Sequence, residues 1–346
     1  MAMPEITVRG AGIFGLSIAW VLTRRGASVR VVDLYGPGSG SSGGLVGALA
    51  PHVPENWNDK KAFQLDSLLM AEAFWAEVQV AGGVDPGYAR TGRVQPIGDD
   101  QALGLARART HGARDLWQGR AVWEVIRVED AGDFAPLSPS GYLIRDTLTG
   151  RMHPRQACAA LVAALRAKGV DVVPEAPDRG AVIWATGWRG LLDLSEAFAK
   201  PVGAGIKGQS AALAHDAGSV PQVFVDGLHI IPHANGTVAI GSTSERDFDT
   251  PDGLDAQCED LIARAVAAMP MLADAPVVDR WAGVRPRARS RAPMLGAWPG
   301  RDGHFIANGG FKIGFGMAPK VAEVMADLVL EGRDSIPDGF RVEASM

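Results

Sequence analysis

The sequence has little of several features that mark other classes of protein. Only two cysteines, Cys158 and Cys258, occur in 346 residues and they lack CxxC spacing, so neither a disulfide framework nor a metal site is expected. No run of about twenty apolar residues occurs, so no membrane span is expected. The net charge of -5 gives no general attraction to nucleic acid. The apolar stretch 11–22 has no small-residue cleavage site after it, and we therefore expect a cytoplasmic protein rather than a secreted one.

What is present fits a soluble enzyme of about two domains. The length of 346 residues is greater than a single hydrophobic core usually serves. A composition of 47% hydrophobic and 21% charged residues is ordinary for a globular protein. No internal repeat is evident. Two domains, one of them binding a dinucleotide, are the starting expectation.

A glycine fingerprint opens the chain between an apolar strand candidate at 6–8 and a helix candidate at 16–25. A second strand candidate at 28–32 is followed by Asp33, eighteen residues past the third glycine. A carboxylate at this position can accept hydrogen bonds from a ribose. The glycines allow a tight turn and close approach of a diphosphate to the helix N-terminus. A glycine-rich turn without a ligand is the alternative. The predicted cofactor residues here are Gly10, Gly12, Ile13, Phe14, Gly15 and Asp33.

A glycine- and serine-rich run at 36–44 follows Asp33 and leads into an apolar segment that ends at His52. A flexible linker is one interpretation. The run nevertheless lies at the carboxyl end of the second strand, where doubly wound sheets bind their ligands. We therefore predict that this segment closes on the cofactor through Ser41, Ser42, Gly43, Gly44 and Leu45.

The later elements alternate between two kinds of segment. Helices are predicted near 61–80, 100–118, 155–168, 255–269 and 318–331, and strands at 92–97, 170–173, 181–185, 228–233, 237–240 and 305–307. The strand-helix pairs are typical of a nucleotide-binding sheet, whereas 201–245 reads as an antiparallel sheet. The two domains are therefore expected to be interleaved in sequence.

At this point the chain resembles a known family. The segments Gly10–Gly15 with Asp33, Trp184–Gly187, Ile231–Thr243, Ala282–Pro286 and Gly309–Lys312 occur in the order seen in FAD-dependent amine oxidoreductases. The chain looks like the D-amino-acid oxidase superfamily, nearest to glycine oxidase and sarcosine oxidase, over nearly its whole length. The C-terminal pair of motifs is far more specific than the N-terminal fingerprint.

The resemblance implies an α/β (α+β) fold, in which a doubly wound FAD/NAD(P)-binding Rossmann-like domain is interleaved with an antiparallel-sheet substrate domain. It implies residues 1–83, 150–200 and 280–346 for the FAD-binding domain and 84–149 and 201–279 for the substrate domain. It implies non-covalent FAD as the cofactor. The further cofactor residues that it implies are Ala185, Thr186, Gly187, Gly309, Gly310, Phe311, Lys312, Ile313 and Gly314.

The resemblance also implies a reaction, the oxidation of the C–N bond of an amino acid or N-substituted glycine to an imine, with hydride transfer to flavin. Reoxidation by oxygen or by a carrier both stay open. Arg285 matches the arginine that binds the substrate carboxylate, and its planar fork suits that ligand. Lys312 stands where relatives carry a second cation, which binds the carboxylate or stabilises reduced flavin. A structural arginine and a solvated lysine are the alternatives.

Histidines are the other candidates for the catalytic site. His52 follows the glycine-rich segment, and His229 and His233 lie four residues apart on one predicted strand, so they face the same side. His52 and His233 are the better pair. Because amine oxidation at a flavin needs only a deprotonated amine, a structural role is favoured for each histidine. Trp57 and Trp188 are assigned to the core by default.

Three departures from the family pattern stand out. Arg9 replaces an apolar residue before the fingerprint, and it either reaches outward or serves the diphosphate. Only a few residues separate Val173 from Ala181, where relatives carry a longer strand pair over the adenine. Arginines at 285, 287, 289 and 291 would share one side of an extended strand. That run suggests a substrate with an extra anionic group, against the alternative of a basic solvated loop.

Other functions remain open from the sequence. A nicotinamide-dependent dehydrogenase shares the fingerprint but not the later motifs. A flavin-binding protein without turnover has no use for a convergent Arg285 and Lys312. An enzyme that acts on an aminoacetate group of a modified tRNA base also resembles this chain, but the acidic net charge disfavours nucleic acid as partner. The expected partner is a small-molecule amine or amino acid, and a homo-oligomer stays an open alternative.

Overall fold

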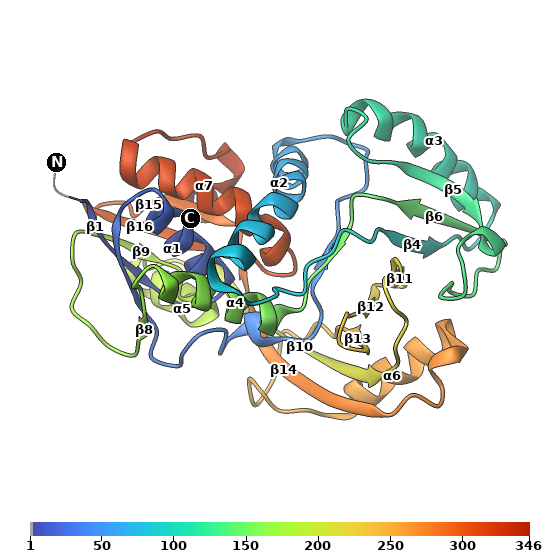
Figure 1. The fold of residues 1–346 in the computed structure, drawn as a ribbon. Helices are drawn as coiled ribbons and strands as arrows, with labels where there is room; N and C mark the ends of the chain where they lie inside the picture. The colour runs from blue at the N-terminus through green and yellow to red at the C-terminus, as the bar shows by residue number, and fades with distance from the viewer. Residues whose placement is uncertain (1–2) are drawn as a thin grey trace.

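The computed structural model describes residues 3–346, which fold into two large sheets and one short one, with helices packed around the large sheets (Figure 1). The first sheet has six strands in the order β15-β16-β9-β1-β2-β8. All neighbours are parallel except β15 and β16, which are antiparallel. The strands are β1 (Glu5–Arg9), β2 (Ser28–Val32), β8 (Val172–Val173), β9 (Ala181–Trp184), β15 (Met294–Ala297) and β16 (His304–Asn308).

Five helices accompany this sheet: α1 (Ile13–Arg24), α2 (Asp59–Gly82), α4 (Pro154–Ala167), α5 (Gly187–Ala197) and α7 (Gly314–Glu331). Helix α1 packs against α4 and α7, and α2 packs against both of those helices. The residues from Ile13 to Leu22 are all buried, because α1 is covered by β1 and β2 on one side and by helices on the other. This all-round burial explains why α1 is apolar throughout rather than amphipathic.

The second sheet has eight strands in the order β14-β10-β13-β12-β11-β4-β6-β5 and forms the right-hand half of Figure 1. Its neighbours are antiparallel except β11 and β4. The strands are β4 (Arg93–Pro96), β5 (Trp123–Arg127), β6 (Tyr142–Asp146), β10 (Gly203–Ala214), β11 (Gln222–Val225), β12 (Leu228–Pro232), β13 (Thr237–Gly241) and β14 (Val277–Ala288). Helices α3 (Asp100–Leu116) and α6 (Ala256–Ala268) belong to this half.

Each half has its own apolar core. The largest cluster of buried side chains includes Trp20, Trp75 and Met317 and lies among α1, α2, α4 and α7. A second cluster, with Ile230 and Leu261 in it, fills the space between the eight-stranded sheet and α6. A short two-stranded sheet, β3 (Ala48–Leu49) with β7 (Gly150–Arg151), connects the segments that pass between the halves.

The expected fold class is confirmed: a doubly wound α/β half is interleaved with an antiparallel-sheet half. One proposed domain boundary needs adjustment, because residue 280 lies inside β14, which pairs along its length with β10. We therefore propose that residues 280–288 belong with the substrate half. Helix α5 was not expected, and α7 begins at Gly314, four residues before the predicted 318. Pro319 therefore lies inside α7, in its second turn, rather than at its start.

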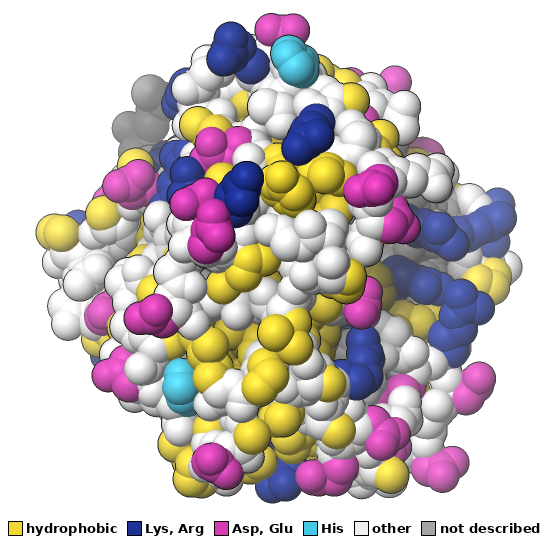
Figure 2. Space-filling model, turned by 90° about the vertical axis from the view of Figure 1, so that its right-hand side faces the viewer, with side chains coloured by type: hydrophobic (Ala, Val, Ile, Leu, Met, Phe, Trp, Pro, Cys, Tyr) yellow, Lys and Arg dark blue, Asp and Glu magenta, His cyan; other side chains and the backbone are white. Residues whose placement is uncertain are grey.

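The face shown in Figure 2 carries acidic, basic and hydrophobic side chains interspersed. Within residues 3–346, no helix is both long and apolar enough to cross a membrane. Over the same range, no group of three or more His, Cys, Asp or Glu side chains is placed to hold a metal ion.

Candidate functional site

The glycine fingerprint forms the turn from β1 into α1. Gly10 has φ +106°, and a Cβ there would lie 2.2 Å from the Ala185 carbonyl oxygen of the neighbouring strand. A Cβ on Gly15 would lie 1.9 Å from the Gly10 carbonyl oxygen. Both positions therefore require glycine, Gly10 for its backbone conformation and Gly15 for the packing of helix on turn.

The start of α1 is open to a ligand. Its N-cap, Gly12, provides no side-chain cap, and the Ile13 N–H donates to Ser42 Oγ at 2.9 Å. The Asp33 carboxylate, at the end of β2, accepts the Ala11 N–H at 2.7 Å and the Tyr35 N–H at 2.9 Å. The uncapped helix end presents N–H donors and a positive dipole to an anion, while Asp33 keeps acceptor capacity beside it.

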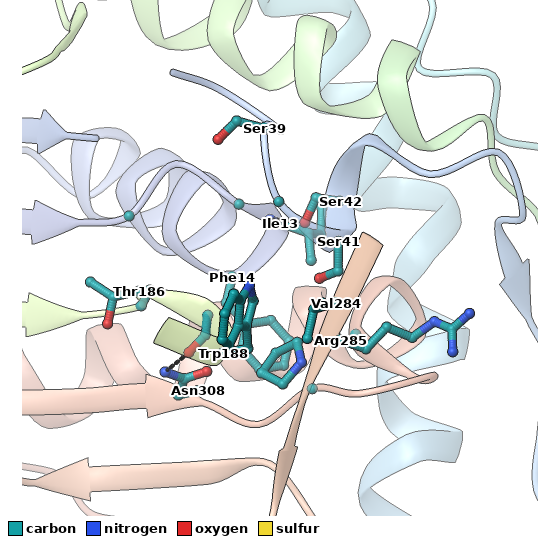
Figure 3. Close-up of a pocket in the computed structure, with 18 of the residues that line it drawn as sticks. Ile13, Phe14, Ser39, Ser41, Ser42, Thr186, Trp188, Val284, Arg285 and Asn308 are labelled. Carbon is teal, nitrogen blue, oxygen red and sulfur yellow. Dashed lines mark hydrogen bonds between the residues drawn. The ribbon is translucent and has the colours of Figure 1, made fainter. Parts of the chain in front are cut away.

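A single large cavity runs from this turn to the antiparallel sheet. Its volume is about 1260 Å³, above the usual range of about 300–1,000 Å³ for small-molecule sites. Figure 3 shows Ser41 and Ser42 beside Ile13 on one side and Thr186, Trp188 and Asn308 on another. The predicted residues that line it are Gly10, Gly12, Ile13, Phe14, Asp33, Ser41, Ser42, Gly44, Leu45, Ala185, Thr186, Gly187, Arg285, Gly310, Phe311, Lys312 and Gly314.

Four other predicted cofactor residues, Gly15, Gly43, Gly309 and Ile313, do not line the cavity. A Cβ on Gly43 would lie 2.4 Å from the Gly38 carbonyl oxygen, and one on Gly309 would lie 2.6 Å from Ala288 Cβ. Ile313 packs against the large core cluster as the N-cap residue of α7. These residues shape the wall by close packing from behind it.

Asn308 joins two parts of the wall that are distant in sequence. Its Nδ2 donates to the Gly187 carbonyl at 2.9 Å, drawn dashed in Figure 3, and its Oδ1 accepts the Gly309 N–H at 2.8 Å. The end of β16 is thereby fixed to the start of α5. Sequence reasoning missed Asn308 because an asparagine before a glycine pair reads as an ordinary turn residue.

Arg285 lies on β14 with 8% of its surface exposed, and its side chain extends from the strand into the cavity wall (Figure 3). Its Nη2 donates to Ser242 Oγ at 2.6 Å and its Nη1 to the Thr243 carbonyl at 3.2 Å. Burial lowers the pKa of Arg285 to about 10, so it remains charged at neutral pH. Its remaining N–H groups are available for a ligand.

Lys312 reaches the same end of the cavity from the loop between β16 and α7. Its Nζ lies 5.8 Å from the centre of the Phe311 ring. Burial and the nearby charge of Arg285 both lower the pKa of Lys312. The two predicted cations are therefore brought together, with an unfavourable interaction between them.

The catalytic histidine candidates His52 and His233 lie behind the cavity wall and do not line it. The backbone N–H of His52 donates to Gln64 Oε1 at 2.8 Å, and its Nδ1 bonds the same oxygen. His233 Nε2 bonds the Leu45 carbonyl at 3.1 Å, and burial lowers the pKa of His233 to about 4. Through these bonds, both histidines support the backbone of the segment from Leu45 to His52.

His229 lines the cavity in their place. Its ring packs on Phe224 with 4.6 Å between ring centres, and its Nδ1 is buried without a hydrogen-bond partner. Burial, Arg93 and Lys312 lower the pKa of His229 to about 3, which keeps the ring neutral. Strand alternation predicted that His229 and His233 face the same side. Because β12 ends at Pro232, His233 lies outside the strand, and only His229 faces the cavity.

The arginine run does not converge on the cavity, and only Arg285 lines it. The Arg287 guanidinium lies over the Phe311 ring at 5.8 Å, and Arg289 Nη1 donates to the Met346 carbonyl at 2.9 Å. Arg291 has φ +62° and lies in the turn after β14. The run is extended only as far as Ala288, so the expected common side exists for Arg285 and Arg287 alone.

Arg9 reaches sideways to the short segment after β8. Its Nε donates to Asp178 Oδ1 at 2.7 Å, and its guanidinium lies 5.3 Å from the centre of the Trp184 ring. The segment Pro174–Pro177 lines the edge of the cavity, and Arg9 holds it there. Arg9 therefore anchors the short segment that connects β8 to β9.

Several lining residues had no clear sequence signal. Most of them come from the eight-stranded sheet and from α5, where no glycine motif marks them. Trp188, assigned to the core by default, lines the cavity, while Trp57 packs against the large core cluster. Neither cysteine lines the cavity. The lining residues on this side that the sequence did not single out are Val46, Arg189, Ser210, Phe224, Ser242, Trp281 and Val284.

Comparison with known proteins gives matches over nearly the whole chain. Residues 5–328 match the family described as DAO, FAD dependent oxidoreductase. The chain is similar to glycine oxidase from Pseudomonas aeruginosa, with 29% identity over 96% of each chain. It is also similar to the uncharacterized oxidoreductase YurR of Bacillus subtilis, with 26% identity over 95% of each chain.

Solved structures share the fold at lower identity. Glycine oxidase from Geobacillus kaustophilus superposes with a TM-score of 0.83 at 20% identity, covering 98% of this chain and 99% of that one. Iminodiacetate oxidase from Chelativorans superposes with a TM-score of 0.82 at 20% identity, covering 97% of this chain and 98% of that one.

Proposed function

We propose a function from one premise: this chain belongs to the DAO family of FAD-dependent oxidoreductases. Its cofactor is therefore FAD, and the nicotinamide interpretation of the fingerprint falls away. The family acts on amino acids and amines. Our proposal is that this member oxidises the C–N bond of a small amino acid or N-substituted glycine to an imine, with oxygen or a carrier as the final electron acceptor.

The residues around the cavity fit FAD. The uncapped start of α1 with Gly10 and Gly12 would hold the diphosphate, and Asp33 would accept the adenosine ribose hydroxyls. The segment Ser41–Leu45 and the loop from Gly310 to Gly314 would enclose the flavin half. A Cβ on Gly12 would lie 3.2 Å from Ser42 Oγ, so glycine there keeps open the approach between the start of α1 and the Ser41–Leu45 segment.

The observation that carries the proposal is Arg285. A guanidinium with 8% exposure bonds only neutral oxygens, of Ser242 and Thr243, and still lines the cavity at the junction of the two halves. Its planar fork suits a carboxylate bound through two oxygens, and such a clamp would aim the α C–H of an amino acid toward the flavin half. When bound, FAD supplies the acceptor for the two electrons and the hydrogen of that bond.

The same cations favour the deprotonated form of the substrate amine. An amine loses its proton more readily beside positive charge and away from water, and Arg285 and Lys312 provide that charge. No general base is needed in this scheme, in line with His52 and His233 lying outside the cavity. The relatives named glycine oxidase and iminodiacetate oxidase support a substrate with a carboxylate next to the nitrogen.

The test is the visible absorption spectrum of the purified protein, followed without oxygen while amino acids and N-alkyl glycines are added. Bleaching of the flavin band by one compound supports the proposal and names the substrate class. A flavin band that no compound bleaches contradicts it and favours the tRNA-linked substrate or a non-catalytic role. Repeating the assay with Arg285→Ala should raise the substrate concentration needed for bleaching by about a hundredfold.

A further inference from the structure

The two ends of the cavity are lined by different parts of the chain. One end, here called the substrate end, is lined from the antiparallel sheet and the loop before α7 and contains Arg285 and Lys312. The other end, here called the dinucleotide end, surrounds the fingerprint turn Gly10–Gly12. Two exposed side chains that line the dinucleotide end, Tyr35 and Arg189, belong to none of the sequence motifs.

Tyr35 and Arg189 meet across the carboxyl end of β1. Tyr35 follows β2, and Arg189 lies in the first turn of α5, which follows β9. Strands β2 and β9 pair with β1 from opposite sides, so the segments after them leave the sheet on either side of the fingerprint turn. The guanidinium carbon of Arg189 lies 4.6 Å from the centre of the Tyr35 ring. This contact, here called the Tyr35–Arg189 clasp, therefore bridges the cavity at the turn where the diphosphate would lie.

A second aromatic ring also holds the Arg189 guanidinium. Its carbon lies 5.2 Å from the centre of the Trp188 ring. The Trp188 ring in turn packs edge-on against Phe248, with 6.5 Å between ring centres. Contacts with aromatic rings orient a cation without neutralising it. The clasp is therefore already formed, and its charge is available, before a ligand binds.

The positive charge of Arg189 is not compensated by the protein. The cations that line the dinucleotide end are Arg9 and Arg189, and Arg9 pairs with Asp178 at 2.7 Å. No ion pair within residues 3–346 includes Arg189, although Asp193 lies one turn further along α5. A cation in the first turn of a helix is also unfavourable, because the positive end of the helix dipole lies there. A bound anion would offset this repulsion.

The start of α5 offers hydrogen-bond donors to the same anion. Its N-cap residue, Thr186, makes no side-chain cap, and both Thr186 and Gly187 line the cavity. The start of α1 is also uncapped. The diphosphate of FAD is dianionic at neutral pH, and a position between two open helix starts and beside Arg189 matches that charge.

We propose that the Tyr35–Arg189 clasp retains the cofactor: Arg189 binds the diphosphate of FAD, and Tyr35 holds the guanidinium in position over it. The inference depends on FAD as the cofactor and is independent of which amine the enzyme oxidises. No covalent bond is made or broken at the clasp. Its effect is on the affinity for FAD and on the rate at which FAD leaves the protein.

The experiment measures FAD binding to the full-length protein after its cofactor has been removed. Flavin fluorescence is followed during titration to obtain the Kd, and after dilution to obtain the release rate. Arg189→Gln should raise the Kd about tenfold, the effect of one charge-assisted hydrogen bond, and should speed release by a similar factor. Because Arg189 is exposed, the loss of affinity should be larger at low salt than at high salt.

Further variants separate the charge from the aromatic contact. Arg189→Lys should recover part of the affinity, because it keeps the charge without the planar fork. Tyr35→Ala should raise the Kd about threefold, whereas Tyr35→Phe keeps the ring face and should leave the Kd unchanged. Tyr35→Ala combined with Arg189→Gln should bind FAD no more weakly than Arg189→Gln alone.

Arg301→Gln is the matched control. Arg301 is also exposed and lies over two aromatic rings, 5.3 Å from the centre of Trp184 and 5.2 Å from that of Trp298, but it does not line the cavity. Its replacement should leave the Kd of FAD unchanged.

Three results would overturn the proposal. A Kd of Arg189→Gln within about twofold of wild type at low salt would show that the clasp does not bind the cofactor. A fall in Tm of the FAD-free variant as large as that of the FAD-loaded variant would give Arg189 a merely structural role in α5. A shifted absorption band of the bound flavin would place Arg189 beside the flavin ring rather than the diphosphate. Weaker binding with an unchanged band and an unchanged FAD-free Tm supports the proposal, whichever amines bleach the flavin.

Discussion

Gly208 should be essential for substrate binding although it does not line the cavity. It lies on β10 opposite Gly283 of β14, beside the guanidinium of Arg285. A Cβ at this position would lie 1.8 Å from Nη2, 2.3 Å from Cζ and 2.5 Å from Nη1 of Arg285. The Gly208→Ala substitution therefore places a methyl group where the arginine fork now sits.

The size of the effect follows from the displacement. Moving Nη2 from 1.8 Å to an ordinary contact of 3.4 Å requires a shift of about 1.6 Å, which breaks the bonds to Ser242 and Thr243. Misplacing a positioning group by about 1 Å costs about 10²-fold, so kcat/KM should fall about 10²- to 10³-fold, or roughly 3–4 kcal/mol. Because the atoms that must move are the end of a flexible side chain, Tm should fall by only a few degrees.

The assay measures flavin bleaching, FAD content and Tm together. Gly104→Ala in α3, where nothing lies within 4 Å of the new Cβ, serves as control. A double-mutant cycle with Arg285→Ala gives the decisive comparison, because Gly208→Ala should have no further effect once the fork is gone. Wild-type kcat/KM in Gly208→Ala, or an equal loss in both backgrounds, would refute the reasoning.

Three further predictions concern other parts of the molecule. Gly15→Ala should leave the purified protein with less than about a tenth of its FAD, since the Cβ would lie 1.9 Å from the Gly10 oxygen, whereas Gly98→Ala should keep the cofactor; flavin absorbance per polypeptide measures both. The pKa of His233 is lowered to about 4, so the unfolded chain takes up its proton first and the free energy of unfolding should fall by about 3 kcal/mol as pH drops from 6.5 toward 4. Urea unfolding of His233→Gln should show a weaker fall, and parallel curves would contradict this. The pKa of Lys312 lies below its ordinary value, so binding of acetate, which has no amine, should weaken on the alkaline side and Lys312→Arg should delay that loss to higher pH; titration of the flavin spectrum detects it.

The dinucleotide half could be predicted well because its signals are local. The fingerprint, the strands on either side of it and the Asp33 position are all set within residues 5–33, and the structure places them as β1, α1 and β2. The same holds for Thr186-Gly187 after β9, since a strand that ends in a glycine turn has few alternatives. Steric requirements for glycine, such as that at Gly10, appear directly in the sequence.

The substrate end could be predicted only in part, because its residues meet through long-range pairing. Arg285 and Lys312 were found through the family resemblance, and the structure brings both to the cavity. The choice between His229 and His233 depends on where β12 ends, one residue before His233. Strand β14 continues through Pro286 because it pairs with β10, and no local sequence pattern shows that pairing. The predicted alignment of the arginines at 285, 287, 289 and 291 on one side failed for the same reason, because β14 ends at Ala288.

The order of strands in the six-stranded sheet has a consequence for synthesis of the chain. Strand β1 leaves the ribosome first, yet its neighbour β9 comes after residue 180 and β16, which pairs with β9, comes after residue 303. The packing of the apolar helix α1 is completed later still, because α7, which covers one side of it, is the last long helix. The nascent chain must therefore keep one apolar side of α1 uncovered until α7 emerges, and FAD can be captured only once the final forty or so residues have been made. Cellular yield of this enzyme should depend on chaperone capacity and flavin supply at the end of translation rather than during it.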